Sequence, residues 1–136
     1  MGLLSKLGEG RRKKVVEFVQ AHLEPGETVE AVLPMTQTDN PAFVGIQLVS
    51  FFGVAVTDRR VHFVRWGRGV PERVEEVIAS LPRAQVTVEE WRTGFVSSDL
   101  ALRGGPDDVM AVDVPALHKK DAVALVATLS AGQAVG

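Results

Sequence analysis

The chain has 136 residues, the usual size of one domain, and its 46% hydrophobic and 24% charged residues are ordinary for a globular protein. It contains no cysteine, which excludes disulfides, thiolate nucleophiles and thiolate metal sites together. Its longest apolar run, residues 41–57, is interrupted by glycine and polar residues and is shorter than the roughly 20 residues that a helix needs to cross a bilayer. We therefore expect one domain in the cytoplasm, without a membrane-spanning segment.

The net charge of −2 is unevenly distributed along the chain. Residues 1–23 carry five Lys or Arg and two Asp or Glu, a net charge of +3, whereas residues 24–136 carry ten and fifteen, a net charge of −5. An acidic body repels nucleic acid, so we expect no nucleic-acid partner. Only the N-terminal segment has the charge to attract an anionic surface.

An amphipathic helix is predicted over residues 10–23. Pro25 and Gly26 end it, because proline restricts the residue before it and glycine allows a sharp change of direction. The apolar positions recur at the i, i+3, i+4 and i+7 spacing of a helix that packs by one face, namely at Val15, Phe18, Val19 and His22. We divide the chain into an N-terminal segment with this helix at residues 1–23, one domain at 24–132 and a tail at 133–136.

Seven strands are predicted to follow, from alternating or continuous apolar residues bounded by turn residues. Short polar turns between them, such as residues 57–60 and 104–108, predict antiparallel neighbours. The strands cover residues 27–35, 51–57, 60–66, 74–81, 84–92, 95–103 and 109–114. A last helix is predicted over residues 115–130, with Gly132 marking its end. Its apolar stripe consists of Ala122, Leu125, Val126 and Leu129.

The pattern leaves the structure of residues 36–50 open. Asp39 or Asn40 could cap a short helix with Pro41 in its first turn, or the segment could be an apolar loop. If it covers an end of the sheet, its apolar side chains belong to the core. If it projects, they form an exposed patch that must meet another chain or a bilayer. We name its apolar residues as a candidate interaction surface: Phe43, Val44, Ile46 and Leu48.

The order helix, seven strands, helix predicts a mainly β fold of the α+β class. An antiparallel meander has to bury one face, so we expect it to fold over itself as a seven-stranded barrel or orthogonal sandwich. The C-terminal helix, with its single apolar stripe, is expected to cap the open end. The helix at residues 10–23 is an addition to this core.

Three short segments resemble segments of the bacterial pleckstrin-homology-like (PH-like) domain family, which is related in shape to GRAM domains. They are Leu23-Glu24-Pro25-Gly26-Glu27, Val54-Ala55-Val56-Thr57-Asp58-Arg59-Arg60 and Ile78-Ala79-Ser80-Leu81-Pro82, and the C-terminal helix follows them. The resemblance covers about residues 23–130 and implies a seven-stranded barrel capped by a helix. It also implies a binding or assembly scaffold without catalysis, because PH-like domains present loops and sheet edges to lipids, peptides or other subunits.

The resemblance also bears on phosphoinositides. Members of the family that bind them place several Lys or Arg residues on the loop after the first strand. Here that loop, residues 36–50, contains no basic residue, so nothing in it can pair with phosphate oxygens. We therefore expect no phosphoinositide binding by the usual PH loop.

Two groups of basic residues are further candidates for an interaction surface. Arg59 and Arg60 lie in a predicted turn and could hold an anion, although such a pair is more often part of a solvated turn. The basic run at residues 11–14 could make a weak, salt-sensitive contact with an anionic membrane, unless its helix packs on the protein's own sheet. The run consists of Arg11, Arg12, Lys13 and Lys14.

No group of residues has the spacing of a catalytic or metal site. The three histidines lie far apart and outside the HxxxH and HExxH patterns. Adjacent carboxylates at residues 89–90 and 107–108 point to opposite faces of a strand or face water in a turn. We therefore expect no enzymatic activity, no metal and no cofactor.

The sequence favours a non-catalytic interaction domain that works through protein contacts, with an unidentified partner or with copies of itself. One alternative is a peripheral membrane module that uses the basic N-terminal helix. A second alternative is a carrier of a small ligand between the sheet and the C-terminal helix.

Overall fold

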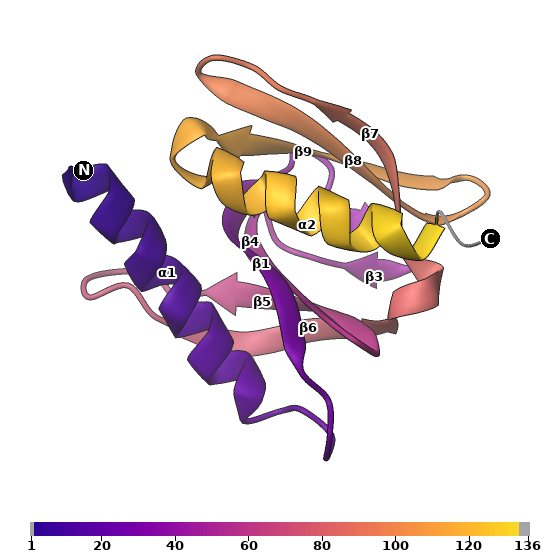
Figure 1. Cartoon of the computed structure of the whole chain (residues 1–136), viewed down its shortest axis with the longest axis horizontal. Coiled ribbons are helices and arrows are strands. Elements are labelled where there is room, and N and C mark those ends of the chain that lie inside the picture. The colour runs from indigo at the N-terminus through magenta and orange to yellow at the C-terminus, as the bar shows by residue number, and fades with distance from the viewer. Residues whose placement is uncertain (1, 134–136) are drawn as a thin grey trace.

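The computed structural model describes residues 2–133, and the side chains of these except residues 4, 5, 132 and 133. This part of the chain is mainly β, with one helix near each end (Figure 1). The elements are α1 (Leu3–Gln20), β1 (Val29–Gln37), β2 (Ala42–Phe43), β3 (Ile46–Gln47), β4 (Phe51–Thr57), β5 (Arg60–Trp66), β6 (Val74–Pro82), the 3-10 helix η1 (Arg83–Gln85), β7 (Thr87–Arg92), β8 (Ser97–Gly105), β9 (Asp108–Pro115), the 3-10 helix η2 (Ala116–His118) and α2 (Lys119–Gln133). The predicted α+β class, with seven long antiparallel strands between two helices, is confirmed.

The seven long strands form one antiparallel sheet in the order β6-β5-β4-β1-β9-β8-β7. β1 is the shared strand, because it pairs with β4 along its length but with β9 only where Gln37 faces Asp113. Two hydroxyls extend this short seam: Thr36 and Thr38 donate to the carbonyl oxygens of Asp113 and Ala111 at 2.5 and 2.8 Å. The sheet therefore has two parts, β6-β5-β4-β1 and β9-β8-β7, joined along one narrow line.

The main core lies between the two parts of the sheet and α2, which packs against β1 and β7 (Figure 1). The rings of Phe43, Phe52 and Phe63 meet at its centre, with centroids 5.9 Å apart in both adjacent pairs. The predicted stripe of α2 is confirmed: Ala122, Leu125 and Leu129 are buried, and Val126 packs at the edge of this core.

A second, smaller core lies between α1 and the other face of the sheet. Val15 and Val19 of α1 are buried there against Val32, Ala55 and Val64. Successive residues of a strand point to opposite faces, and the neighbours of Val32 and Ala55 face the main core. Central strands buried on both faces read as continuous apolar runs, which explains the sequence of β4 and β5.

α1 begins earlier and ends earlier than predicted. It starts at Leu3, seven residues before the predicted start. Gly8 and Gly10 lie inside the helix and do not interrupt it. Gly8 is buried, and a Cβ added to it would lie 3.6 Å from the Leu117 side chain, so η2 passes close to this turn. The helix ends at Gln20, and His22 is exposed beyond it, with its ring stacked on Phe18 at 5.0 Å. His22 therefore does not belong to the buried stripe.

Other element boundaries differ by a few residues from the predicted ones. β7 starts at Thr87, because residues 83–85 form a 3-10 turn, and β8 starts at Ser97, which leaves Phe95 in the preceding turn. α2 starts after η2 and runs through Gly132 to Gln133, so glycine does not mark its end. The rest of the predicted tail, residues 134–136, lies outside the described residues.

Residues 36–50 contain a small hairpin, β2–β3, so the helical alternative is wrong. Its turn residues, Val44 and Gly45, have φ angles of 53° and 71°, as a two-residue type I′ turn requires. Glycine adopts this conformation freely, whereas valine rarely does. The Val44 amide donates to the Asp108 carboxylate at 2.6 Å, which holds the turn against the β8–β9 connection.

Gly104 provides the space into which the hairpin packs. A Cβ at this position would lie 2.3 Å from Val44 Cγ2 and 2.9 Å from Phe43 Cζ. We predict that Gly104→Ala lowers the free energy of unfolding by about 1–3 kcal/mol, because overpacking must displace the hairpin. Urea denaturation measures the change.

Gly10→Ala is the matched control for this substitution. Gly10 is helical and its added Cβ would meet nothing within 4 Å, so we expect a gain of about 0.5–1 kcal/mol. Equal effects of the two substitutions would contradict the close packing of Gly104 on the hairpin.

Candidate functional site

Arg60, one of the two predicted turn arginines, forms a buried ion pair. Its guanidinium donates twice to Glu27, from Nη2 to Oε1 at 2.6 Å and from Nε to Oε2 at 3.1 Å. The Glu27 side chain is fully buried. The Arg60 hydrogen bonds hold the pKa of Glu27 far below its usual range, although burial opposes them.

Glu27 is the centre of a larger buried polar network. Its Oε2 accepts from Thr57 Oγ1 at 2.6 Å and from His62 Nε2 at 3.1 Å, and its Oε1 accepts from the Glu24 amide at 2.9 Å. His62 Nδ1 lies 2.7 Å from Ser80 Oγ. An ionised carboxylate can only accept hydrogen bonds, so His62 donates to it from Nε2. The neutral ring then accepts a hydrogen bond at Nδ1 from the Ser80 hydroxyl. Burial lowers the pKa of His62 and favours this neutral form.

The three segments that resemble the PH-like family meet in this network. The first contributes Glu27, the second Thr57 and Arg60, and the third Ser80. Arg59 lies at the surface, where it donates to the Pro25 carbonyl at 3.1 Å. The predicted turn arginines therefore bind the neighbouring turn of their own chain.

The basic run at the start of the chain is also largely engaged within the protein. Arg11 donates to both Glu72 oxygens at 2.8 and 3.0 Å, and Arg12 donates to Asp121 at 3.1 Å. These contacts tie α1 to the β5–β6 turn and to the start of α2. Lys14 also reaches this turn, where its Nζ donates to the backbone carbonyl of Glu72 at 2.7 Å.

Lys13 differs from the other three basic residues of the run. Its side chain is exposed and lies 3.9 Å from Glu17, one helical turn further on. An exposed pair of this kind contributes little to stability. The Lys13 side chain is therefore more accessible to solvent than those of Arg11 and Arg12.

Arg11 also meets a buried histidine. Its Nη1 lies 3.1 Å from His118 Nε2. Arginine only donates, so Nε2 accepts and the proton of the neutral ring is on Nδ1, which is buried without a hydrogen-bond partner among the described atoms. Burial, followed by the Arg11 charge, lowers the pKa of His118 to about 4.

The apolar candidates of residues 36–50 face inward. Phe43 and Leu48 are buried in the main core, and Val44 and Ile46 are half-buried against it. The sequence left open whether this segment covers an end of the sheet or projects as an exposed patch. The structure has these four side chains in or against the core, as in the first alternative.

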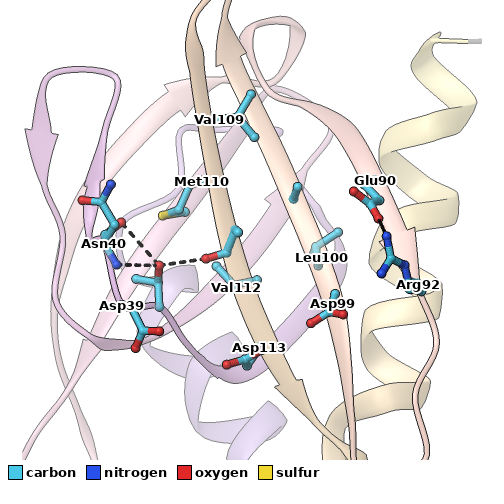
Figure 2. A pocket seen from close by; sticks show the side chains of 13 residues that line it. Asp39, Asn40, Glu90, Arg92, Asp99, Leu100, Val109, Met110, Val112 and Asp113 are labelled. Atoms are coloured by element: carbon cyan, nitrogen blue, oxygen red, sulfur yellow. Dashed lines mark hydrogen bonds and ion pairs between the residues drawn. The ribbon is translucent and has the colours of Figure 1, made fainter.

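A groove that sequence reasoning did not single out lies on the outer face of β8 and β9, with a cavity volume of about 480 Å³ (Figure 2). Its floor includes the cross-strand pair Ala101 and Ala111, and next to it Asp99 faces Asp113 across the two strands. The segment with Asp39 forms one wall, held against β9 by the Thr38 hydroxyl.

The other wall of the groove belongs to β7. There Arg92 pairs with Glu90, as Figure 2 shows. No ion pair neutralises Asp39, Asp99 or Asp113 within the described part of the chain. Two matching patterns, Asp99-x-Ala101 and Ala111-x-Asp113, signal the groove in the sequence, but only the strand register places them opposite each other.

Comparison of the chain with protein-family models, with curated proteins and with solved structures finds no match. Within residues 2–133, no three His, Asp or Glu side chains come together as metal ligands. No helix in the same range is both long and apolar enough to cross a membrane.

The buried position of Glu27 predicts a large effect of its substitution. Glu27→Gln removes the negative charge that pairs with Arg60, whose side chain is 26% exposed, and loss of these charge-assisted hydrogen bonds costs about 1.5–3 kcal/mol. Urea denaturation at neutral pH should show this loss. Glu24→Gln is the control, because Glu24 is a nearby glutamate whose side chain is 58% exposed. It should change the free energy of unfolding by less than about 0.5 kcal/mol. Similar values for the two variants would exclude a central role for the buried pair.

From the lowered pKa of His118 we predict that the free energy of unfolding falls between pH 6.5 and pH 4. Its pKa is lower in the folded state than the ordinary value of 6.5, so the unfolded state binds more protons in this window. The stabilisation is complete above pH 6.5 and is lost as the pH falls to 4, by about 3 kcal/mol in total. His62, whose pKa is also lowered, acts in the same direction.

The contribution of His118 can be isolated with His118→Gln, whose amide oxygen can still accept from Arg11. Denaturation at intervals from pH 7 to pH 4 should give a shallower dependence for this variant. A dependence as steep as that of the wild type would show that His118 is not the responsible group.

Proposed function

We propose that the protein is a non-catalytic interaction domain of the PH-like type, which works through protein contacts, including contacts between copies of the chain. Its strand order, the cap formed by α2 and the meeting of the three family-like segments around Glu27 support this type. The proposed binding site is the acidic groove of Figure 2, which we expect to take an extended basic segment of a partner.

The observation that carries the proposal is the pair Asp99 and Asp113. These carboxylates lie directly opposite each other on neighbouring strands, and like charges in this position destabilise a sheet. A Lys or Arg side chain from a partner would relieve the repulsion, while the Ala101 and Ala111 floor leaves room for its aliphatic stem.

The groove also fits this proposal better than the interior does. A carrier of small ligands would hold its ligand between the sheet and α2. That space is filled by buried side chains, among them Leu33, Phe63 and Leu125. We therefore place binding on the surface and keep the interior as structure.

Neutralising the groove should stabilise the free protein. Asp113→Asn removes the repulsion from Asp99, and its other cross-strand neighbour is the uncharged Gln37, so it is predicted to raise the free energy of unfolding by about 0.2–1 kcal/mol, measured by urea denaturation. Asp107→Asn serves as the control. It also removes one negative charge, but Asp107 is exposed in a turn and does not line the groove.

The same variants test binding. In a heteronuclear NMR titration, an extended Lys- and Arg-rich peptide should shift the amide signals of Thr38, Asp99, Ala101, Ala111 and Asp113, and an acidic peptide should not. The double variant Asp99→Asn/Asp113→Asn should abolish these shifts, while Asp107→Asn combined with Glu9→Gln should keep them. Shifts spread evenly over acidic surfaces, or equal loss in both double variants, would contradict a specific site. Self-association through the groove would appear as a mass above one chain in sedimentation equilibrium that Ala111→Trp reduces.

A further inference from the structure

Four segments that are far apart in the sequence form one end of the molecule. In Figure 1 the first turns of α1, the β5–β6 turn and the β7–β8 turn all lie on the left, with the start of α2 between them. We call this region the basic end and define it as residues 2–14, 67–73, 92–97 and 116–121.

Direct contacts hold the basic end together. Arg11 and Lys14 of α1 bind Glu72 of the β5–β6 turn. The amide of Ala116 donates to the carbonyl of Val96 at 3.1 Å, which joins the β7–β8 turn to the start of α2. Arg12 and Asp121 connect that start to α1. The four segments therefore keep a fixed relation to one another.

Charge is concentrated at the basic end. Its segments contain ten of the fifteen Lys and Arg residues and three of the seventeen Asp and Glu residues, a net charge of +7 that leaves −9 for the rest of the chain. Two of the three acidic residues, Glu72 and Asp121, are paired with arginine inside this end. Lys6, Arg68 and Lys120 are exposed and have no ion-pair partner within the described residues.

Apolar side chains project from the same end. Of the eight large apolar side chains that are exposed in the described part, five belong to it: Leu3, Leu7, Val70, Phe95 and Val96. Val70 is 99% exposed and Phe95 98% exposed, each at the tip of a turn. A side chain this exposed makes no contribution to the core and can be buried only by a contact outside the molecule.

We propose that the basic end docks on an anionic lipid bilayer, with Val70, Phe95 and Leu3 inserted below the headgroups. The apolar tips come from separate segments with cationic residues between them, so they do not form the continuous apolar patch of a typical protein interface. An interface with apolar chains below and anionic groups above matches this arrangement.

Vesicle binding tests the proposal. Extruded vesicles of phosphatidylcholine with phosphatidylserine should co-sediment with the protein at low salt, and vesicles of phosphatidylcholine alone should not. Each basic residue near an anionic surface raises the partition coefficient by about fivefold, so Lys6→Gln/Arg68→Gln/Lys120→Gln should lower it by roughly a hundredfold. Added salt should weaken binding in the same way.

The apolar tips are tested separately. Val70→Ser/Phe95→Ser should lower the partition coefficient by roughly tenfold or more, and the fold should persist because neither side chain packs in the core. Val109→Ser/Val123→Ser is the matched control, since these valines are 42% and 47% exposed and lie outside the basic end. In Phe95→Trp the added fluorescence should shift to shorter wavelength on vesicles, and in Val109→Trp it should not.

Three results would overturn the proposal: no co-sedimentation with anionic vesicles at low salt, equal binding by the two double serine variants, or an unshifted emission of Phe95→Trp on vesicles that the protein has bound. The variants that test docking, at Lys6, Arg68, Lys120, Val70 and Phe95, leave the groove between β8 and β9 unchanged, and only the Val109 controls change a residue that lines it. Failure of bilayer docking and failure of the groove as a peptide site are therefore distinguishable.

Discussion

The buried ion pair between Glu27 and Arg60 is the interaction on which this fold depends most. A charge removed from water is tolerated only when its partners are complete. Here the carboxylate accepts hydrogen bonds from arginine, threonine, histidine and a backbone amide at the same time. The partners come from the turn before β1, the β4–β5 turn and β5 itself, and Ser80 extends the network to β6. The pair thereby aligns four neighbouring strands at one end of the sheet.

This network gives a physical meaning to the resemblance found in the sequence. Each of the three family-like segments contributes at least one polar residue to it. Thr57 and Glu27 also accept hydrogen bonds from nearby backbone amides. The contributed residue types are what the network requires: two hydroxyls, a guanidinium and a carboxylate that fits between them. In this chain these residues serve the structure, and the resemblance says nothing by itself about a ligand.

The sequence predicted those parts of the molecule whose pattern is local. The stripe of α2 depends on neighbours in the chain, and it is confirmed. The contacts that were not predicted depend on distant partners. The sequence left open whether the run with Arg11 and Arg12 is free or packs on the protein, because their partners Glu72 and Asp121 lie 61 and 109 residues away and no local pattern indicates such pairs. Asp99 and Asp113 are likewise brought together only by strand register.

The arrangement of charge separates the interior from the surface. Inside, each ionised group has a partner of opposite sign, and the main core is filled by apolar side chains. Outside, a carboxylate-rich groove and a cationic end with projecting apolar tips lie mostly on different elements and share Arg92. The two surfaces have opposite chemistry, so the two contacts that we propose call for unlike partners.

The narrow junction between β1 and β9 has a mechanical consequence. Most neighbouring strands share many backbone hydrogen bonds, whereas here one residue pair and two threonine hydroxyls connect the halves. A force that pulls the two parts of the sheet apart across this line meets few backbone hydrogen bonds. Among the described residues it is opposed mainly by α2, which packs against both β1 and β7, and by the β2–β3 hairpin. The packing of α2 against β1 and β7 therefore contributes strongly to the resistance of the domain to a force that separates the two parts of the sheet.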